Sequence, residues 1–533
     1  MLIVAVLPSI LFPPKKPESR TAGRPDSTAR LAPTAPESAA APAQPSARPP
    51  VRPPASTPAE TVWVTSPLYR LGFSTRGGAL VRAELLGYRS FAKGDAGRPV
   101  QLVREGAPLL VYRRAGGGGD TTLVSDWTLT PSATRVEVAS EGATLSFTGE
   151  RDGGRFALQY RFLPAEYRFT VRGRIEGFGP AGATMVLGLG DGLRSVEADS
   201  MDDFRHYAVV TKSTKTQRTD FGSVKPGERK ILDGPFEWAG VKSKYFFVAS
   251  LAVEENEPRF GAAILEGGPR TVSTSSLFGR STVATGTAVA VTLPVPPAGE
   301  FGYQVYVGPL EYRRLSQLGH DLDDANPYGG VLQPIIQPVS VLVVNILIWM
   351  HDQLRLAYGW VLIIFGILVR LLLWPLNQRA MESSIRMQAV APLLKQIQDR
   401  YKNEPERLQR EMMRLYKEHN VNPFGGCLPM LLPMPVLFAL FFVFANTIEF
   451  RGVPFLWLPD LARPDPFYII PIVMGLSMFV LSTELRVRTE PVLRREQHLQ
   501  HPAAVYDRAA ASAGAGEANV TGRREAGGGM RAV

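Results

Sequence analysis

The pattern of apolar and polar residues changes twice along the chain. Residues 13–60 are rich in proline and alanine, apolar and polar residues alternate from about residue 61, and long apolar runs dominate after Pro327. Alternation with a period of two is typical of strands with one buried face, whereas a run of about 20 apolar residues is typical of a membrane-spanning helix. The sequence therefore predicts a tether, a β-rich domain and a helical membrane region, in that order.

The β-rich domain is predicted over residues 61–325. In the segment YRFTVRGRIE, one face is apolar and the other is mainly charged. The apolar face holds Tyr167, Phe169, Val171, Gly173 and Ile175. Similar short runs, with glycine-rich turns between them, are TRVEVAS, ATLSFTGE, KYFFVASLAVE, TAVAVTLPV and FGYQVYVG. Many such segments indicate a large antiparallel β-sandwich.

Two segments precede this domain. Residues 13–60 contain 13 prolines, which donate no backbone hydrogen bond, so a disordered, extended linker is expected. Residues 1–12, MLIVAVLPSILF, are too short to cross about 30 Å of hydrocarbon and lack the flanks of a cleavable signal peptide. They are interpreted as the remnant of an N-terminal membrane anchor, with a loose apolar terminus as the alternative.

Four apolar segments follow the β-rich domain. Residues 358–376 and 424–448 are predicted transmembrane helices, and residues 467–483 are a shorter third one. The run within residues 326–357 is interrupted by polar residues and prolines, and an interfacial helix is predicted there. The interrupting residues are Gln333, Pro334, Gln337, Pro338 and Asn345.

Loop charges predict the orientation of these segments. Residues 377–423 hold nine Lys or Arg, whereas residues 449–466 hold only Arg451 and Arg463. Because positively charged loops stay in the cytoplasm, residues 377–423 are predicted to be cytoplasmic. Apolar stripes on both sides of the turn KNEPE predict a helical hairpin there. Residues 449–466 form a loop on the far side with the β-rich domain, which is the periplasm in a Gram-negative cell.

One charge lies inside a predicted span. Arg370 is six residues before Leu376, about 9 Å along a helix. A charge at this depth is costly and persists where water or a partner solvates it. Two interpretations fit: a functional arginine in a hydrated pocket, or an arginine whose side chain extends to the inner headgroups.

The composition excludes other classes of function. The net charge of +10 is spread along the chain without a basic and aromatic block, so no nucleic-acid specificity is expected. No HExxH, P-loop or nucleophile-elbow motif occurs, so we predict no enzyme, no catalytic residue, no metal ligand and no cofactor. The one cysteine, Cys427, cannot form an internal disulfide and is interpreted as a small packing residue.

Several motifs together resemble the YidC-type membrane protein insertases of Gram-negative bacteria. They are TRGGAL (75–80), VYVGPLEYRRL (305–315), VRLLLWPL (369–376), YKEHNVNPFGGCLPMLLPMPVLFAL (416–440) and DPFYIIPIVMG (465–475). The resemblance covers about residues 61–482. It implies a multi-pass inner-membrane protein of mixed fold, with a periplasmic antiparallel β-sandwich, an α-helical transmembrane bundle and a cytoplasmic helical hairpin.

The resemblance also implies a function. Family members are non-enzymatic insertases and chaperones that insert and fold new inner-membrane proteins, alone or with the Sec translocon. The arginine matching Arg370 lines a hydrated groove open to the cytoplasm and the lipid. Implied partners are nascent membrane proteins, the lipid bilayer and, through residues 377–423, the ribosome and the signal recognition machinery.

Four residues are candidates for the face along which a substrate helix slides. They are Met430, Met434, Leu437 and Phe438. Their positions match the family pattern, and the alternatives are that they are core residues or lipid-facing residues.

The chain departs from the family pattern after Ser482. The family has two further spans there, whereas residues 484–533 contain no apolar run. We interpret this segment as a disordered, non-family tail produced by truncation or a frameshift. Two other functions stay open: an inactive insertase fragment, or a membrane-anchored periplasmic sandwich that binds sugars or proteins. The predicted hairpin favours the insertase, because a simple anchor does not need one.

Overall fold

The computed structural model describes most of the chain between Ala59 and Thr483. The described residues are 59–116, 121–177, 183–252, 259–268, 271–276, 279–284, 286–326, 328, 332–418 and 434–483. They fall into two compact units, divided between Arg451 and Gly452. The predicted anchor remnant, almost all of the linker and the C-terminal tail lie outside the described residues.

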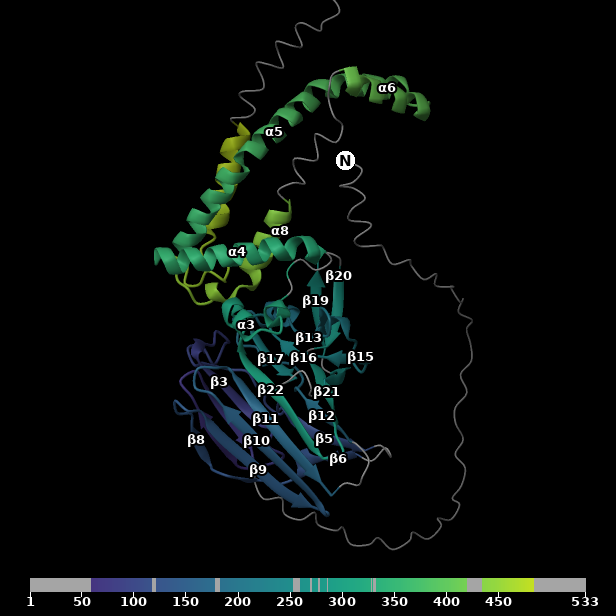
Figure 1. The fold of residues 1–533 in the computed structure, drawn as a ribbon. Helices are drawn as coiled ribbons and strands as arrows, with labels where there is room; N and C mark the ends of the chain where they lie inside the picture. The colour runs from purple at the N-terminus through teal and green to yellow at the C-terminus, as the bar shows by residue number, and fades with distance from the viewer. Residues whose placement is uncertain are drawn as a thin grey trace, which may run out of the picture. The chain divides into compact units, whose positions relative to one another are not determined.

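The β-rich domain of the first unit is built from three large sheets and one hairpin (Figure 1). The nine-stranded sheet has the order β14 (Thr216–Asp220), β13 (Ala208–Lys212), β16 (Trp238–Lys242), β17 (Phe246–Leu251), β22 (Glu300–Pro309), β11 (Arg168–Glu176), β10 (Gly154–Phe162), β9 (Ala143–Arg151) and β7 (Thr130–Pro131). The six-stranded sheet has the order β15 (Arg229–Phe236), β18 (Phe260–Gly267), β21 (Thr287–Val295), β12 (Ala183–Gly188), β5 (Val111–Gly116) and β6 (Thr121–Leu123). The five-stranded sheet has the order β4 (Pro99–Gln101), β3 (Leu80–Arg89), β2 (Tyr69–Ser74), β1 (Thr61–Thr65) and β8 (Arg135–Glu137). The hairpin pairs β19 (Thr271–Ser276) with β20 (Gly279–Ala284).

Each of the six quoted alternating segments contains a strand, so this part of the prediction is confirmed. In β11 and the residue before it, the predicted apolar face is buried, with exposed fractions from 0% at Val171 to 7% at Ile175. The pairing is antiparallel except between β1 and β8, which run parallel. The sandwich is therefore not purely antiparallel, because the chain leaves this sheet for β5, β6 and β7 in the other two sheets before it returns as β8 beside β1.

The nine-stranded sheet packs against both smaller sheets. The hydroxyl of Tyr112 in β5 lies 3.0 Å from that of Tyr160 in β10 and 2.7 Å from that of Tyr303 in β22. The ring of Phe73 in β2 lies 4.6 Å from the Tyr160 ring and 6.4 Å from the Phe147 ring in β9. All of these side chains are buried, so the core of the domain lies between the nine-stranded sheet and its two covers.

The segment TRGGAL is a turn. It joins β2 to β3, and Gly77 and Gly78 have φ values of 69° and 70°. A Cβ atom at Gly77 would lie 2.6 Å from the Cα of Ser125, so both the backbone angle and the space require glycine.

Short helical segments complete the domain. They are η1 (Val124–Asp126), α2 (Ser200–Arg205), η2 (Phe221–Ser223), α3 (Tyr312–Leu318) and η3 (Leu322–Ala325). The segment between α3 and η3 is tied to the nine-stranded sheet, because the indole nitrogen of Trp238 donates a 2.8 Å hydrogen bond to the His320 carbonyl. Lys212 forms an ion pair with Asp321 next to it.

We expect residues 59–326 to fold without the rest of the chain, since the core described above lies entirely within them. The fragment should show a β-type circular dichroism spectrum and one cooperative unfolding transition. A fragment ending at Leu310 should be less stable by more than about 3 kcal/mol, because Trp238 loses its buried acceptor, Lys242 loses Asn326, and the buried side chains of Leu315 and Leu322 are removed. Broad, non-cooperative melting of the longer fragment would contradict an autonomous domain.

Longer helices follow the domain. They are α4 (Gln333–Leu354), α5 (Tyr358–Arg400), α6 (Pro405–Glu418) and α8 (Met434–Asn446), and the short η5 (Ile448–Phe450) follows α8. The predicted span at 358–376 and the first arm of the predicted hairpin are one continuous helix of 43 residues. No glycine occurs between Gly366 and Gly425, and the helix continues through Pro375 and Pro392 although proline disfavours the interior of a helix.

The second unit contains a loop and an apolar helix. In the loop, the carboxylate of Asp460 accepts hydrogen bonds from the backbone of Gly452 at 2.9 Å and Ala462 at 2.8 Å. The helix covers Ile469–Thr483, close to the predicted 467–483. The carboxylate of Asp465 accepts a hydrogen bond from the Ile470 backbone at 2.8 Å, which satisfies a free donor at the start of this helix.

Candidate membrane-facing site

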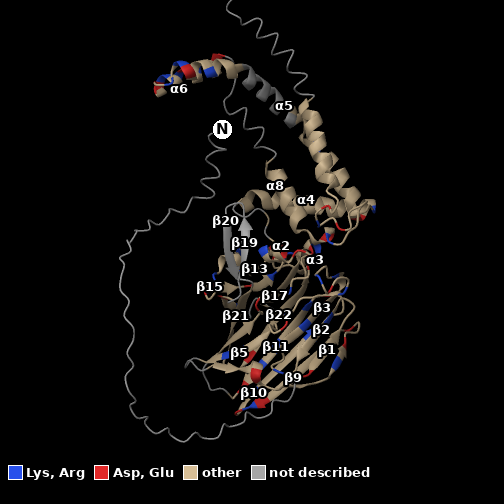
Figure 2. Cartoon of the chain, turned by 180° about the vertical axis from the view of Figure 1, so that it is seen from behind, with Lys and Arg blue, Asp and Glu red and all other residues tan. Residues whose placement is uncertain are grey.

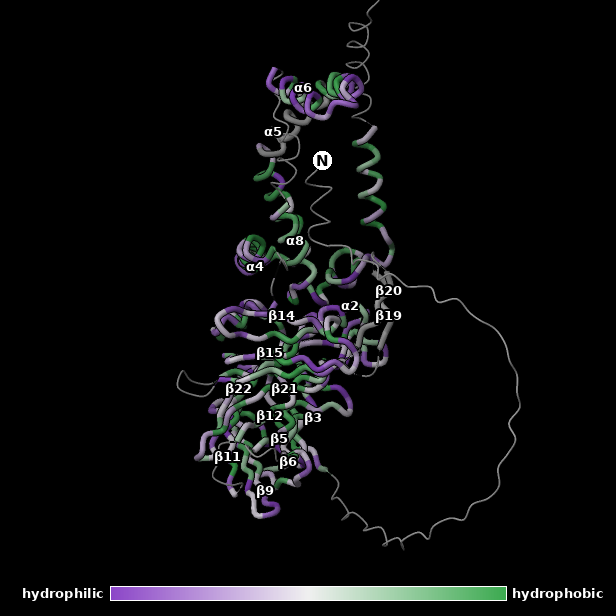
Figure 3. The backbone as a smooth tube through the Cα atoms, turned by 90° about the vertical axis from the view of Figure 1, so that its right-hand side faces the viewer, coloured by the Kyte–Doolittle hydropathy of each residue, from purple (hydrophilic) through white to green (hydrophobic). Residues whose placement is uncertain are grey.

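The first part of α5 leaves large apolar side chains uncovered. Residues 358–375 are long and apolar enough to cross a bilayer, and only 17% of this stretch is buried within the protein. The exposed side chains are Trp360, Ile363, Ile367, Leu368, Leu371, Leu372 and Trp374. Figure 3 shows this stretch as hydrophobic. A helix that is apolar on most of its circumference and uncovered is suited to lipid rather than water.

Arg370 lies within this apolar stretch, and it is exposed. It is twelve residues after Tyr358, about 18 Å along the helix, and six residues before Leu376. No residue among those that the structure describes forms an ion pair or hydrogen bond with it. A guanidinium keeps its charge, so this group needs water, lipid headgroups or a bound segment to solvate it.

Helix α4 has two different faces. Val343, Val344 and Leu347 are buried, whereas Ile335, Leu342 and Trp349 are more than half exposed. The helix also passes the length and hydropathy test for a span, but it runs crosswise to α5 (Figure 1).

Helix α8 packs on α4 and carries three of the four predicted sliding-face residues. Ala439 and Val443 are fully buried on one side, and Met434 is half-buried. Leu437 and Phe438 are exposed, as are Phe441 and Phe444 further along the helix. Met430 and Cys427 lie outside the described residues.

Helices α5 and α6 form a hairpin. Val390 of α5 and Leu415 of α6 form its small core, against which Leu393, Leu394, Ile397 and Tyr416 pack. Helix α6 carries many charged residues (Figure 2), and on its exposed face an ion pair joins Arg414 to Glu418 at 2.8 Å. This charged face is suited to contact with water, whereas the apolar first half of α5 is suited to contact with lipid.

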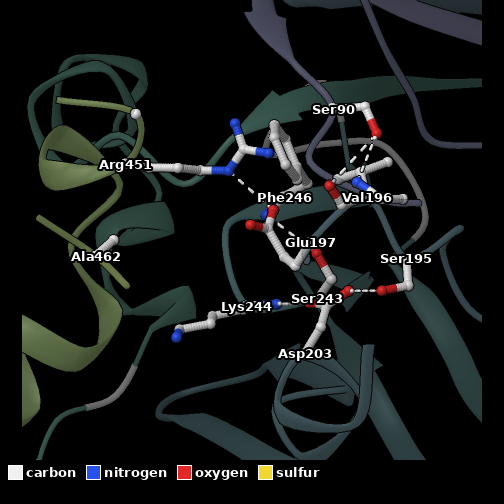
Figure 4. Close-up of polar contacts among 12 residues, drawn as sticks. Ser90, Ser195, Val196, Glu197, Asp203, Ser243, Lys244, Phe246, Arg451 and Ala462 are labelled. Carbon is white, nitrogen blue, oxygen red and sulfur yellow. Dashed lines mark hydrogen bonds and ion pairs between the residues drawn. The ribbon is translucent and has the colours of Figure 1, made fainter. Parts of the chain in front are cut away.

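The start of α5 meets the end of α8 at an aromatic cluster. The ring of Phe450 in η5 lies 5.5 Å from that of Tyr358 and 5.9 Å from that of Phe444. The next residue, Arg451, points into the β-rich domain, where its Nε lies 2.8 Å from an oxygen of Glu197 (Figure 4).

This contact was not predicted from the sequence. Arg451 was interpreted only as a loop charge, and Glu197 is 254 residues away along the chain. The apolar residues around Arg451 in IEFRGVPF were the one available signal that this arginine is buried.

A β-rich extramembrane domain, an uncovered apolar helix of spanning length and an amphipathic helix beside it define an integral membrane protein. Two family models match the chain: "YidC periplasmic domain" over residues 61–342 and "60Kd inner membrane protein" over residues 349–502. The chain belongs to the YidC family of membrane protein insertases.

Relatives named "Membrane protein insertase YidC" match most of the chain. The protein of Oleidesulfovibrio alaskensis is 30% identical over 84% of this chain and 81% of its own length. That of Syntrophus aciditrophicus is 29% identical over 90% of this chain and 87% of its own length. A solved galactose mutarotase-like protein from Lactobacillus casei aligns with 47% of this chain and 99% of its own, at 11% identity and a TM-score of 0.30, which is too low to support any inference.

The family match extends beyond the motifs quoted above. It continues to residue 502, whereas those motifs end before Ser482. Residues 484–502 have no long apolar run, which is why their relationship was not seen from hydropathy alone.

Proposed function

We propose that this protein inserts newly made membrane proteins into the lipid bilayer of the inner membrane, without enzymatic chemistry. The relatives that match most of its length carry the name of this activity. The observation that carries the proposal is Arg370, an exposed charge inside an uncovered apolar helix with no partner among the described residues.

The proposed mechanism is electrostatic. A hydrated positive charge inside the membrane attracts the acidic or polar segment of a substrate and lowers the cost of its passage. The apolar helix of the substrate then leaves sideways, along the exposed face formed by Leu437, Phe438 and their neighbours Phe441 and Phe444 on α8. Met434 extends the proposed face to the first residue of this helix, and Met430 remains a candidate on the ground of the sequence alone.

The arrangement of the helices favours α5 as the spanning helix and α4 as the interfacial one. Since the two helices run crosswise, a membrane crossed by α5 contains α4 closer to its plane (Figure 1). The exposed apolar face of α4, with Ile335, Leu342 and Trp349, then lies in the acyl layer. The β-rich domain occupies the periplasm, and the charged α5–α6 hairpin extends into the cytoplasm.

Cytoplasmic placement of the hairpin makes it the proposed contact for the ribosome and the signal recognition machinery. Nascent membrane proteins are the substrates, and the Sec translocon is a proposed partner for substrates with large translocated domains. The exposed charges of α6 favour a soluble, charged partner over lipid.

Thiol labelling tests this topology. In a Cys427→Ser background, single cysteines at Ser200, Pro405 and Trp457 should be probed with a maleimide that cannot cross the inner membrane. Cells with a permeable outer membrane should label positions 200 and 457, while position 405 should label only after lysis. Labelling of 405 in intact cells, or protection of 200, would contradict the proposed orientation.

Reconstitution tests the activity itself. Liposomes containing the purified chain should insert a small single-span protein whose translocated end is acidic, and protein-free liposomes should insert much less. Insertion is scored by protection of the translocated end from added protease. Equal protection in both preparations would contradict the proposed function.

A further inference from the structure

Arg451 is almost completely buried although it lies in a connecting segment directly after η5. Its side chain is 3% exposed, and that of its partner Glu197 is 12% exposed. The ion pair joins the segment that follows α8 to a loop of the β-rich domain (Figure 4). A buried pair of this kind is strongly destabilised when only one partner is removed, because the other is left as a buried charge without a counter-ion.

The rest of the guanidinium faces aromatic rings. Its carbon atom lies 4.4 Å from the ring centre of Phe91, 5.4 Å from that of Phe246 and 5.9 Å from that of Tyr245. Nη2 is buried and has no hydrogen-bond partner among the described residues. Aromatic faces attract cations, so this pocket of the β-rich domain is built for a positive group.

The carboxylate side of the pocket is held in place from within the β-rich domain. The backbone N–H of Phe91 donates to the Val196 carbonyl at 2.8 Å, next to Glu197. The buried carboxylate of Asp203 fixes the same loop, because it accepts hydrogen bonds from the Ser195 hydroxyl at 2.7 Å and the Lys244 backbone at 3.1 Å. The loop that carries Glu197 is therefore held by contacts within the β-rich domain itself.

The arginine side is equally fixed to the helices. The backbone N–H of Arg451 donates to the Ile448 carbonyl at 2.9 Å, which closes the turn of η5. Phe450 in that turn packs against Tyr358 and Phe444. A displacement of Arg451 consequently displaces the η5 turn, through which the end of α8 contacts the start of α5.

We propose that Arg451 is a positioning residue through which the β-rich domain holds the C-terminal end of α8. The helix whose exposed apolar face is proposed to guide substrates thus has one end fixed from outside the membrane. The structural part of this proposal stands on the contacts above, and its consequence for insertion rests on the proposed function.

Trypsin measures the structural part in the full chain, because it cuts after arginine and the Arg451–Gly452 bond is reachable only when Arg451 leaves its pocket. Glu197→Gln keeps the shape of the partner and removes its charge. In detergent micelles, mass spectrometry should show the peptide ending at Arg451 forming about tenfold faster or more in this variant. Arg451→Lys keeps the charge but loses the planar stacking and should be cut after residue 451 at an intermediate rate.

The matched control is Arg313→Ala. It removes an exposed 2.6 Å ion pair to Asp352, which joins α3 to α4 near the same junction. Exposed pairs contribute little, so cutting after Arg451 should stay at the rate of the unaltered chain. If Glu197→Gln is cut no faster than this control, Arg451 is not an anchor and the proposal is overturned.

A second measurement separates the buried charge from simple loss of packing. Burial raises the pKa of Glu197 to about 7, against the attraction of Arg451, so a Glu197 left alone can neutralise itself by taking up a proton. An arginine left alone cannot. The apparent melting temperature of the full chain should therefore fall more in Glu197→Gln than in Arg451→Met. The double variant should melt at a higher temperature than Glu197→Gln alone. Additive losses would overturn the ion-pair argument.

Insertion by the same variants tests the functional part. With the reconstituted assay, Glu197→Gln should lower insertion several-fold at normal protein levels, and Arg313→Ala should not. Faster cleavage after Arg451 with unchanged insertion would overturn the role of Arg451 in insertion, but Arg451 would still be an anchor for α8. An unaltered chain that inserts nothing would refute the proposed function instead, and the trypsin result would still decide the anchor.

Discussion

Replacing Arg370 with alanine or glutamate is expected to remove most insertion activity, whereas lysine should retain most of it. If the residue acts as a positive charge in a hydrated groove, a lysine ammonium on its flexible stem can occupy the same space. Alanine removes the attraction, and glutamate repels an acidic substrate segment. The loss should be largest for substrates whose translocated segment is acidic.

The competing interpretation, an arginine that only extends to the headgroups, predicts the opposite for alanine. On insertion scales, removing a charge from the centre of a span relieves a cost of roughly 2.5–3.5 kcal/mol, so Arg370→Ala would then be tolerated. Growth of an insertase-depleted strain, with protein levels checked by blotting, distinguishes the two. Arg463→Ala, at an exposed arginine of the second unit, is the control for loss of one positive charge. Full activity in Arg370→Ala would exclude the groove role.

Replacing Asn326 with leucine should destabilise the chain more than replacing Lys242 with methionine. Lys242, at the end of β16, has no exposed surface, and its ammonium donates to the side-chain oxygen of Asn326. Asn326→Leu leaves the buried amino group of Lys242 without its acceptor, at a cost of about 1–3 kcal/mol. Lys242→Met fills the same volume without a charge, and its effect should stay within about 1 kcal/mol. The double variant should be more stable than Asn326→Leu alone.

The pH dependence gives an independent check of the Lys242 environment. Burial, aided by the charge of Arg218, lowers the pKa of Lys242 well below its ordinary value. In the pH window between this lowered pKa and the pKa of a lysine in the unfolded chain, near 10.4, the unfolded chain binds more protons than the folded chain. The free energy of unfolding should therefore rise with pH in this window relative to Lys242→Met. Denaturant titrations of both proteins in the same detergent measure this difference, and a difference that stays constant with pH would show that Lys242 is not held in an apolar site.

The strands were predictable because their signal is local. The alternation in residues 167–176 needs only the period of a strand and one buried face, and the structure buries that face in β11. The TRGGAL turn was predictable for a similar reason, since two adjacent glycines at positive φ require no distant partner. The extent of α5 was harder, because the change from lipid-facing to charged sequence near Leu376 was interpreted as a boundary between elements. A helix is continued by its own hydrogen bonds, whatever solvent surrounds it.

Contacts between the domain and the helices could not be predicted from one sequence. Nothing in the spacing of Glu197 and Arg451, or of Lys242 and Asn326, distinguishes these residues from ordinary surface charges and amides. Burial of both partners depends on how the strands and helices pack together. Arg370 of the candidate site, in contrast, could be predicted from the sequence, because it stands out locally as a charge among apolar residues.

The unbroken course of α5 has a mechanical consequence. A helix of 43 residues is about 65 Å long, more than twice the thickness of the hydrocarbon layer. Its far end belongs to the hairpin with α6, and no glycine interrupts it between Arg370 and that end. Pro375 and Pro392 lie within this stretch and each favours a kink, but the chain stays helical through both, so a soluble partner that tilts the hairpin is expected to move the arginine as well.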